Sequence, residues 1–358
     1  MTVDARTSVP IPNVAEAFGA LMQHIEEHDI DLEHISASHA RFTRDGCEFD
    51  FRHDGTALTV RLYAPNENML YFLREAVAAQ ISEIDPAAGS SVSWADLERS
   101  VNADGAPVNF QKLTLEDRRI IFPGMIRLTL NAERIASLLD GLHVKLMRPS
   151  KGYNGDPEWP RVADNGVTVW PKGESKLHVR YYTLRDVRPE KNEVDIDVVQ
   201  HAGGMIADWA EHANIGDQIG LMGPAGEPSL PNTDGPVLLA GDETALPAIA
   251  RILEAAPASM DGTVLIAFPE QADPYLYLPD TAMNVIPVPG NQFKTKCTEI
   301  TKELVASNLT YTYAWFGGES QTANEMRRLF KSDLKLGKGD QLSVAYWQEG
   351  GLGDADRR

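Results

Sequence analysis

Cysteine is scarce in this sequence, which has Cys47 and Cys297 as its two copies in 358 residues. That count excludes a disulfide framework, a four-cysteine zinc site and an all-cysteine iron–sulfur cluster. The sequence also lacks any run of about 18 apolar residues, so we expect no integral membrane segment. Residues 1–14 contain neither a cationic region nor an apolar run, so no export signal is predicted. We therefore expect a cytoplasmic protein.

Positive charge is scarce as well. The 33 Lys and Arg residues are outnumbered by 52 Asp and Glu residues, which gives a formal net charge of -19. Such a chain would repel nucleic acid, and no run of Lys and Arg offers a basic patch, so no nucleic-acid partner is expected. A composition of 43% hydrophobic and 24% charged residues is typical of a globular protein, and the length suits two or three domains.

The pattern of residues 1–100 predicts a small α+β domain that ends in a linker at residues 85–89 and a polar turn at residues 102–107. Its expected elements are helices at residues 14–32 and 66–84 and strands at residues 40–42, 47–51 and 57–62. His24 and His28 have the i, i+4 spacing of helical metal ligands. No third ligand follows, so surface histidines are the favoured interpretation.

Residues 108–231 consist mainly of short strands without long helices between them, which predicts an antiparallel β-barrel. The expected strands are at residues 119–122, 125–130, 142–147, 167–170, 176–182, 194–199 and 218–222, and one helix is expected at residues 204–213.

Residues 234–350 alternate strands with helices, which predicts a parallel, doubly wound α/β domain. The continuous apolar run at residues 236–240 is typical of a strand buried on both faces. Further strands are expected at residues 263–268, 284–287, 311–316 and 341–344, and helices at residues 245–255, 298–307 and 320–331.

The stretch at residues 178–207 carries the chemistry that the sequence suggests first. On a strand, Arg180 and Tyr182 share a face, so a guanidinium for a phosphate stands beside a flat ring for an isoalloxazine. Thr183 adds a hydroxyl, and the next strand delivers His201. The glycines that follow begin a helix at residues 204–207, whose first N–H groups suit a pyrophosphate. The alternative is a barrel strand with an exposed arginine and a packed tyrosine.

Two turns in the last domain are further candidates for nucleotide binding. Residues 242–244 follow a buried strand and begin a helix, the place at which open α/β sheets receive nucleotides. The glycine pattern Gly-x-Gly-x-x-Gly is absent, and helix capping by Asp242 and Glu243 is an equal alternative. Gly317, Gly318 and Glu319 combine a permissive turn with a helix start.

Several motifs in this order resemble the siderophore-interacting protein family, ferredoxin-reductase-like flavoproteins that reduce ferric siderophores. They are Arg180-x-Tyr182-Thr183-x-Arg185, His201 with the glycines behind it, Gly223-Pro224-x-Gly226, residues 241–249, residues 315–319 and Tyr346-Trp347. Three positions depart from the family pattern, with Ala202 in place of a glycine, Met205 in place of a proline and Gln348 in place of an arginine.

The resemblance implies an FAD-binding barrel, an NADH- or NADPH-binding α/β domain and a set of cofactor-binding residues. That set is Arg180, Tyr182, Thr183, His201, Gly204, Met205, Ile206, Ala207, Asp242, Thr244, Gly318, Glu319 and Trp347. No proton-transfer residue is required, because the flavin carries the electron chemistry. Residues 49–62 and 91–94 also resemble a small domain of unassigned function that precedes some reductases of this family.

The implied activity is electron transfer from NAD(P)H through FAD to a ferric siderophore, with release of ferrous iron. A ferredoxin is an alternative electron donor. Alternative functions are a flavin reductase or diaphorase with another acceptor, and a non-catalytic siderophore-binding protein. Basic residues of the barrel region are candidates for attracting an anionic ferric chelate, with a solvated loop surface as the alternative. They are Lys145, Arg148, Lys151, Lys172 and Lys176.

Overall fold

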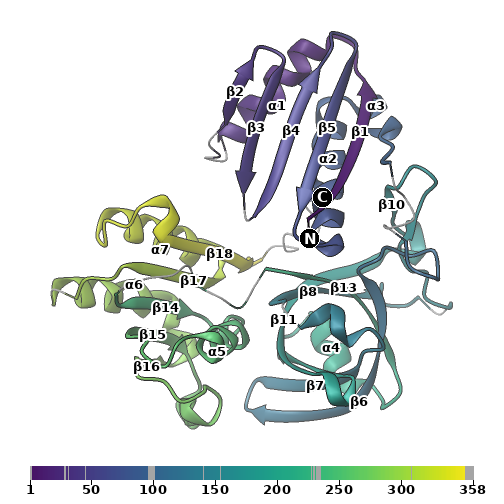
Figure 1. The fold of residues 1–358 in the computed structure, drawn as a ribbon. Helices are drawn as coiled ribbons and strands as arrows, with labels where there is room; N and C mark the ends of the chain where they lie inside the picture. Colours follow the sequence, from purple (N-terminus) through teal and green to yellow (C-terminus); the bar gives the residue numbers. More distant parts are fainter. Residues whose placement is uncertain are drawn as a thin grey trace. The chain divides into compact units, whose positions relative to one another are not determined.

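The computed structural model describes residues 2–27, 30, 32–44, 46–95, 101–139, 141–153, 155–226, 228, 230, 235–307 and 309–350. The chain forms two compact units (Figure 1). Unit 1 comprises residues 1–110 and 152–177, and unit 2 comprises residues 111–151 and 178–358. The sequence placed domain limits at residues 100, 231 and 234, which lie outside the described residues. The division of the chain into three domains therefore stays a prediction.

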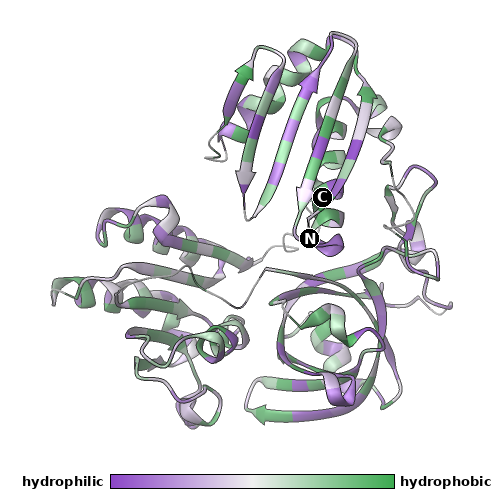
Figure 2. Cartoon of the chain, in the orientation of Figure 1, coloured by the Kyte–Doolittle hydropathy of each residue, from purple (hydrophilic) through white to green (hydrophobic). Residues whose placement is uncertain are grey.

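Unit 1 is an α+β structure built on an antiparallel sheet in the order β1-β5-β4-β3-β2. Apolar and hydrophilic residues alternate along its strands (Figure 2), and the apolar ones form a single core with the helices. Its elements are β1 (Val3–Pro10), α1 (Val14–Glu27), β2 (Glu33–Ser36), β3 (His39–Arg44), β4 (Cys47–His53), β5 (Ala57–Ala64), α2 (Glu67–Ile84) and α3 (Pro86–Ser91). The expected α+β class is confirmed.

The structure of this unit has one strand that the sequence prediction did not name and one helix where it placed a linker. The sequence prediction had no strand before residue 14, yet β1 pairs with β5 over eight residues, from Val3↔Ala64 to Pro10↔Ala57. The expected linker at residues 85–89 is instead the start of helix α3. The Asp85 carboxylate caps that helix by accepting hydrogen bonds from the N–H groups of Ala87 and Ala88, and proline at the first helical position completes the helix start.

Residues 152–177 belong to unit 1 although they are inserted between two strands of the barrel. They contain the two-stranded ribbon β9 (Arg161–Val162) and β10 (Thr168–Val169). The Thr168 hydroxyl lies 2.5 Å from the Tyr71 hydroxyl of α2, and the N–H of Trp94 donates to the carbonyl of Asn165. The expectation that residues 167–170 form a barrel strand was therefore wrong.

Unit 2 begins with a closed six-stranded antiparallel barrel in the order β11-β12-β7-β6-β13-β8, as predicted. Alternate side chains fill its interior, and helix α4 packs against that core through Ile206 and Trp209. The elements are β6 (Phe110–Phe122), β7 (Met125–Asn131), β8 (His143–Pro149), β11 (Leu177–Arg188), β12 (Glu193–Val199), α4 (Met205–His212) and β13 (Gln218–Ala225).

The second half of unit 2 is a parallel five-stranded sheet in the order β16-β15-β14-β17-β18. Its elements are β14 (Val237–Gly241), α5 (Leu246–Ala255), β15 (Gly262–Ala267), β16 (Asn284–Val288), α6 (Gly290–Ala306), β17 (Tyr313–Glu319), α7 (Ser320–Ser332) and β18 (Gln341–Trp347). Helix α5 shares a core with one face of the sheet, and α6 and α7 share a core with the other. The doubly wound fold is confirmed, and its strand order reverses between β14 and β17.

Polar contacts join the barrel to the α/β half of unit 2. The guanidinium of Arg251 on α5 donates a 2.8 Å hydrogen bond to the carbonyl of Leu184, at the end of the predicted flavin-binding motif. Arg185 forms a 2.8 Å ion pair with Glu254, also on α5. The hydroxyl of Tyr277 donates to Asp197 of β12. These contacts fix the positions of β11 and β12 relative to the parallel sheet.

Among the described residues, no helix is both long enough and apolar enough to cross a membrane. The same residues contain no group of three or more His, Cys, Asp or Glu side chains that could hold a metal ion. His28, one of the two histidines with helical spacing, lies outside the described residues. Cys47 and Cys297 are both buried free thiols.

Candidate functional site

The candidate flavin-binding strand is β11, which carries Arg180, Tyr182 and Thr183 in its middle. Arg180 is partly buried and donates from Nη1 to the carbonyl of Val179 at 2.7 Å. Tyr182 packs against the barrel core, and burial raises the pKa of its hydroxyl, which stays protonated. Arg180 and Tyr182 share one face of the strand, and Thr183, only 4% exposed, lies on the other.

His143 of β8 lies beside this motif and was missed by the sequence interpretation. Its Nδ1 is 3.5 Å from the Thr183 hydroxyl, and its Nε2 is 3.3 Å from the hydroxyl of Tyr346 in β18. The His143 and Tyr346 rings meet edge to face, with centroids 5.5 Å apart. Burial lowers the pKa of His143 to about 4, so the imidazole is neutral at pH 7. The sequence signal available for His143 was its position as a polar residue at the start of an apolar strand.

The start of helix α4 is the turn predicted to bind a pyrophosphate. Its N-cap is Gly204, which has no side chain to accept a hydrogen bond from the first turn. The His201 ring lies over Gly204, where an added Cβ would be 2.2 Å from Nε2. The side chains of Ile206 and Ala207 are buried in the barrel core. These residues would therefore contact a ligand through their backbone N–H groups. Both observations fit a pyrophosphate held by backbone donors.

Asp242 is the centre of a hydrogen-bond cluster at the carboxyl end of β14. Its Oδ1 accepts hydrogen bonds from the N–H and hydroxyl of Thr244. Its Oδ2 accepts one from the N–H of Glu319 and one from Nε1 of Trp347, both at 2.8 Å. Burial raises the pKa of this carboxyl despite these four donors. Asp242 therefore organises Thr244, Glu319 and Trp347, three other predicted nucleotide-binding residues.

Glycines allow the strand ends at this point to approach one another closely. Gly241 of β14 is paired in register with Gly317 of β17. A Cβ on Gly317 would lie 2.7 Å from the Trp315 ring and 3.1 Å from the Tyr346 ring. Gly318 has a φ of +154°, and a Cβ there would lie 2.5 Å from Oδ2 of Asp242. The strand order reverses here, the place at which open α/β sheets bind nucleotides.

The five basic residues predicted to attract a ferric chelate are not brought together within one unit. Lys145, Arg148 and Lys151 belong to unit 2, whereas Lys172 and Lys176 belong to unit 1. Lys145 and Arg148 lie on opposite faces of β8, because they are three residues apart. Lys145 lies over the Tyr181 ring at 5.3 Å and Arg148 over the Trp209 ring at 5.1 Å.

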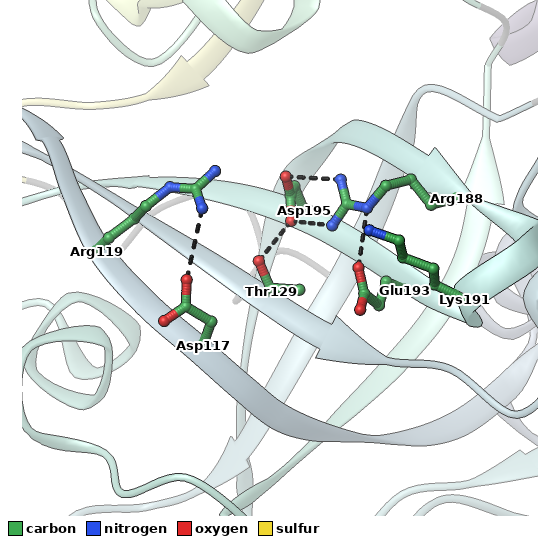
Figure 3. A pocket seen from close by; sticks show the side chains of 7 residues that line it. All are labelled: Asp117, Arg119, Thr129, Arg188, Lys191, Glu193 and Asp195. Carbon is green, nitrogen blue, oxygen red and sulfur yellow. Dashed lines mark hydrogen bonds and ion pairs between the residues drawn. The ribbon is translucent and has the colours of Figure 1, made fainter.

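A charged pocket of about 330 Å³ opens on the barrel wall (Figure 3). The Asp195 carboxylate at its centre accepts hydrogen bonds from Arg188 and from the Thr129 hydroxyl. Arg188 also pairs with Glu193 at 3.0 Å. None of the predicted flavin-binding residues lines this pocket, and five of its six charged side chains are paired, Arg119 with Asp117 and Arg188 with Glu193 and Asp195. We interpret it as an ion-pair network that connects strands of the barrel wall.

Comparison with known proteins agrees with this architecture. The family model for the siderophore-interacting FAD-binding domain matches residues 114–228, and the siderophore-interacting protein model matches residues 235–350. The ferric vibriobactin reductase ViuB of Vibrio cholerae is 28% identical over 257 residues, which cover 65% of this chain and 87% of that protein. The NADPH-dependent ferric-chelate reductase of Escherichia coli is 32% identical over 154 residues, 41% of this chain and 57% of that protein.

A solved structure shows the same likeness. The crystal structure of a siderophore utilization protein from T. fusca is 27% identical and has a TM-score of 0.55, covering 68% of this chain and 94% of that chain. The barrel, which matches an FAD-binding domain, and the doubly wound domain, together with relatives named as reductases, define a reductase that binds a flavin and a nicotinamide nucleotide. The two family models lie end to end over more than half of the sequence, and the chain belongs to the siderophore-interacting protein family.

Proposed function

We propose that this protein transfers electrons from NADH or NADPH through FAD to a ferric siderophore, in the cytoplasm, and so releases ferrous iron. One observation carries the proposal. The β11 motif and the glycine-started helix α4 occur together in one barrel, and that barrel matches the siderophore-interacting FAD-binding domain. Relatives named as ferric vibriobactin reductase and NADPH-dependent ferric-chelate reductase support the choice of substrate and donor.

The residues of the barrel fit FAD by their chemistry. Arg180 supplies a guanidinium for a phosphate, Tyr182 a ring for the isoalloxazine, and Thr183 a hydroxyl for a polar atom of that ring. Met205, Ile206 and Ala207 supply backbone N–H groups for the pyrophosphate beside Gly204, and His201 covers the same turn. Bound FAD supplies the conversion of a two-electron donor into one-electron steps. The chain's own residues position the cofactor and exclude water.

The carboxyl ends of β14, β17 and β18 form the proposed nicotinamide-nucleotide site. Asp242 holds the Glu319 backbone and the Trp347 ring, and Gly318 leaves room for the Asp242 carboxylate to approach the backbone closely. Thr244 begins the turn into α5. Hydrogen bonds between His143 and the hydroxyls of Thr183 and Tyr346 connect this site to the flavin-binding strand. His143 is neutral, so it adds no charge between the two cofactors.

The proposal also covers the acceptor site and the electron donor. Lys145, Arg148, Lys151, Lys172 and Lys176 are proposed to attract the anionic ferric chelate. A ferredoxin in place of the nicotinamide nucleotide is the alternative donor. A protein whose flavin is reduced by neither NADH nor NADPH, but is reduced by a ferredoxin, would select that alternative.

The decisive test combines flavin content with iron reduction. The purified protein should be yellow, and anaerobic mixing with NADPH or NADH and a ferric siderophore should release ferrous iron to a trapping chelator. Arg180→Ala should lower the flavin content, with Arg119→Ala on an exposed part of the same barrel as the matched control. Equal flavin content in Arg180→Ala and the control would contradict the site.

The same assay separates the alternative functions. A flavin reductase or diaphorase would oxidise NADPH with dyes or free flavin and leave ferric siderophores unreduced. A non-catalytic siderophore-binding protein would purify colourless and bind the ferric chelate without oxidising NADPH.

A further inference from the structure

His143 and Thr183 form a pair across two neighbouring strands of the barrel. Strands β8 and β11 are adjacent in the closed barrel, and the N–H of Leu184 donates a 2.9 Å hydrogen bond to the carbonyl of Leu142. One residue along each strand, Nδ1 of His143 and the hydroxyl of Thr183 lie 3.5 Å apart. The barrel backbone therefore holds the imidazole beside the hydroxyl that is predicted to contact the flavin.

The other ring nitrogen of His143 meets Tyr346, which comes from the parallel sheet. Nε2 lies 3.3 Å from the Tyr346 hydroxyl. The Tyr346 ring stands edge to face with Trp315, with centroids 6.3 Å apart, and a Cβ on Gly317 would lie 3.1 Å from it. These neighbours leave the tyrosine ring little room to turn away from His143. Burial raises the pKa of the Tyr346 hydroxyl, so this hydroxyl keeps its proton.

The His143 imidazole has one N–H that donates and one bare nitrogen that accepts, because it is neutral at pH 7. Since each nitrogen lies beside one hydroxyl, one of the two hydroxyls accepts from the ring and the other donates to it. Among the residues that the structure describes, neither hydroxyl has a second hydrogen-bond partner. The tautomer of His143 therefore decides which hydroxyl has a proton left for a ligand.

The two tautomers leave that proton in different places. With the imidazole proton on Nε2, the ring donates to Tyr346 and accepts from Thr183, so the Tyr346 hydroxyl proton is left over. With the imidazole proton on Nδ1, the ring donates to Thr183 and accepts from Tyr346, so the Thr183 hydroxyl proton is left over. Thr183 belongs to the predicted flavin-binding motif, whereas Tyr346 precedes Trp347 of the proposed nicotinamide-nucleotide site.

The acidity of the two hydroxyls favours the tautomer with the proton on Nδ1. A phenol is a stronger donor and a weaker acceptor than an aliphatic hydroxyl, because its ring draws electron density from the oxygen. Tyr346 should therefore donate to Nε2. Thr183 is only 4% exposed, so little water can reach its remaining hydroxyl proton. A buried donor without an acceptor is costly, and an acceptor atom of a bound cofactor would remove that cost.

We propose that His143 is a positioning residue that carries its proton on Nδ1, donates it to Thr183 and so leaves the Thr183 hydroxyl proton for an acceptor atom of the flavin ring. The inference rests on the proposed function, which places FAD beside Thr183. An oxidised isoalloxazine ring has carbonyl oxygens and bare ring nitrogens, which suit such a donor. Tyr346 acts through Nε2 of His143, so a residue of the parallel sheet sets the donor that the barrel offers to its cofactor.

Nitrogen-15 NMR of the FAD-loaded full-length protein, labelled at its histidines, tests the tautomer. The chain has nine histidines, and the signals that disappear in His143→Gln identify His143. Protonated and bare ring nitrogens have well-separated shifts, and free histidine favours the proton on Nε2. His143 should instead have its proton on Nδ1 at pH 7. Tyr346→Phe should move that proton to Nε2, and the control Tyr275→Phe, at an exposed tyrosine, should leave it on Nδ1.

A double-mutant cycle on FAD affinity tests the connection to the cofactor. Thr183→Val removes the donor to the flavin, and Tyr346→Phe removes it indirectly, because Thr183 then donates to Nδ1 of His143. Each variant should raise the Kd for FAD about fivefold, the effect of losing one neutral hydrogen bond. The double variant Thr183→Val/Tyr346→Phe should also raise it about fivefold, because both changes remove the same bond, whereas independent effects would multiply to about 25-fold.

The outcomes separate this inference from the proposed function. A proton on Nε2 of His143 in the FAD-loaded protein would overturn the inference, and so would a double variant whose effect is the product of the two single effects. Either result is compatible with reduction of a ferric siderophore and leaves the proposed function standing. A protein that takes up no FAD would refute the proposed function and the role of His143 together.

Discussion

Replacing Asp242 by asparagine should destabilise unit 2, because the four donors around this carboxylate require four acceptor positions. Oδ2 faces the N–H of Glu319 and Nε1 of Trp347, and Oδ1 faces the N–H and hydroxyl of Thr244. The better orientation of asparagine keeps its oxygen toward Glu319 and Trp347 and turns its NH2 group toward Thr244. The Thr244 hydroxyl can rotate to accept from that group, but the Thr244 N–H loses its acceptor.

The expected loss follows from these contacts. A buried N–H without a partner costs about 1–3 kcal/mol, and each remaining hydrogen bond loses about 1 kcal/mol of charge assistance. Removing the buried charge offsets part of that loss, since burial raises the pKa of the Asp242 carboxyl. We expect Asp242→Asn to lower the free energy of unfolding by about 2–4 kcal/mol.

Urea unfolding at pH 7, followed by fluorescence, measures this loss against two controls. Asp280→Asn makes the same chemical change at an exposed residue and should lie within about 0.5 kcal/mol of the wild type. Trp347→Phe removes a single donor and should cost about 1 kcal/mol. An Asp242→Asn protein as stable as Asp280→Asn would refute the view that the carboxylate is held by its own chain, and would favour direct contact with the nucleotide.

Three further predictions concern other parts of the molecule. In flavin-free protein, the pKa of His143 is about 4 in the folded state, whereas an ordinary histidine in the unfolded chain has a pKa of about 6.5. The unfolded chain therefore takes up a proton first as the pH falls. The free energy of unfolding should decrease by about 2–3 kcal/mol between about pH 6.5 and pH 4. The variant His143→Gln should lose that part of the urea pH profile, and an unchanged profile would speak against burial as the cause. Tyr71→Phe removes the hydroxyl that lies 2.5 Å from Thr168, so protease cleavage within residues 152–177 should increase about tenfold for each 1.4 kcal/mol lost; cleavage at the wild-type rate would contradict the contact. Gly204→Ala puts a Cβ 2.2 Å from Nε2 of His201, so the ring must move, and the Kd for FAD should rise about tenfold in a fluorescence titration; an unaltered Kd would remove this turn from the cofactor site.

Local patterns were sufficient where an element is defined by its own residues. The apolar run of β14 and the motif of β11 indicated a strand buried on both faces and a candidate flavin site, because periodicity and side-chain chemistry are local properties. Strand β1 escaped prediction because its buried positions include Ala5 and Thr7, which are not strongly apolar. Helix α3 escaped because Asp85 and Pro86 were interpreted as a linker rather than as a cap and first turn.

Features that depend on distant pairing could not be found from one sequence. His143 acquires its importance from Thr183, 40 residues away, and Tyr346, 203 residues away. Asp242 was proposed as a cap or a nucleotide contact, and its bond to Trp347 joins residues 105 apart.

The insertion of residues 152–177 into unit 1 has a consequence for how the chain is made. The chain passes between the units three times, after residues 110, 151 and 177, so unit 1 is complete only when residue 177 has been synthesised. Until then, the hydroxyl of Tyr71 lacks Thr168, and the N–H of Trp94 lacks the carbonyl of Asn165. Three strands of the barrel, β6, β7 and β8, precede the insertion and must wait for β11, β12 and β13, so the barrel closes only after the last segment of unit 1 has been synthesised.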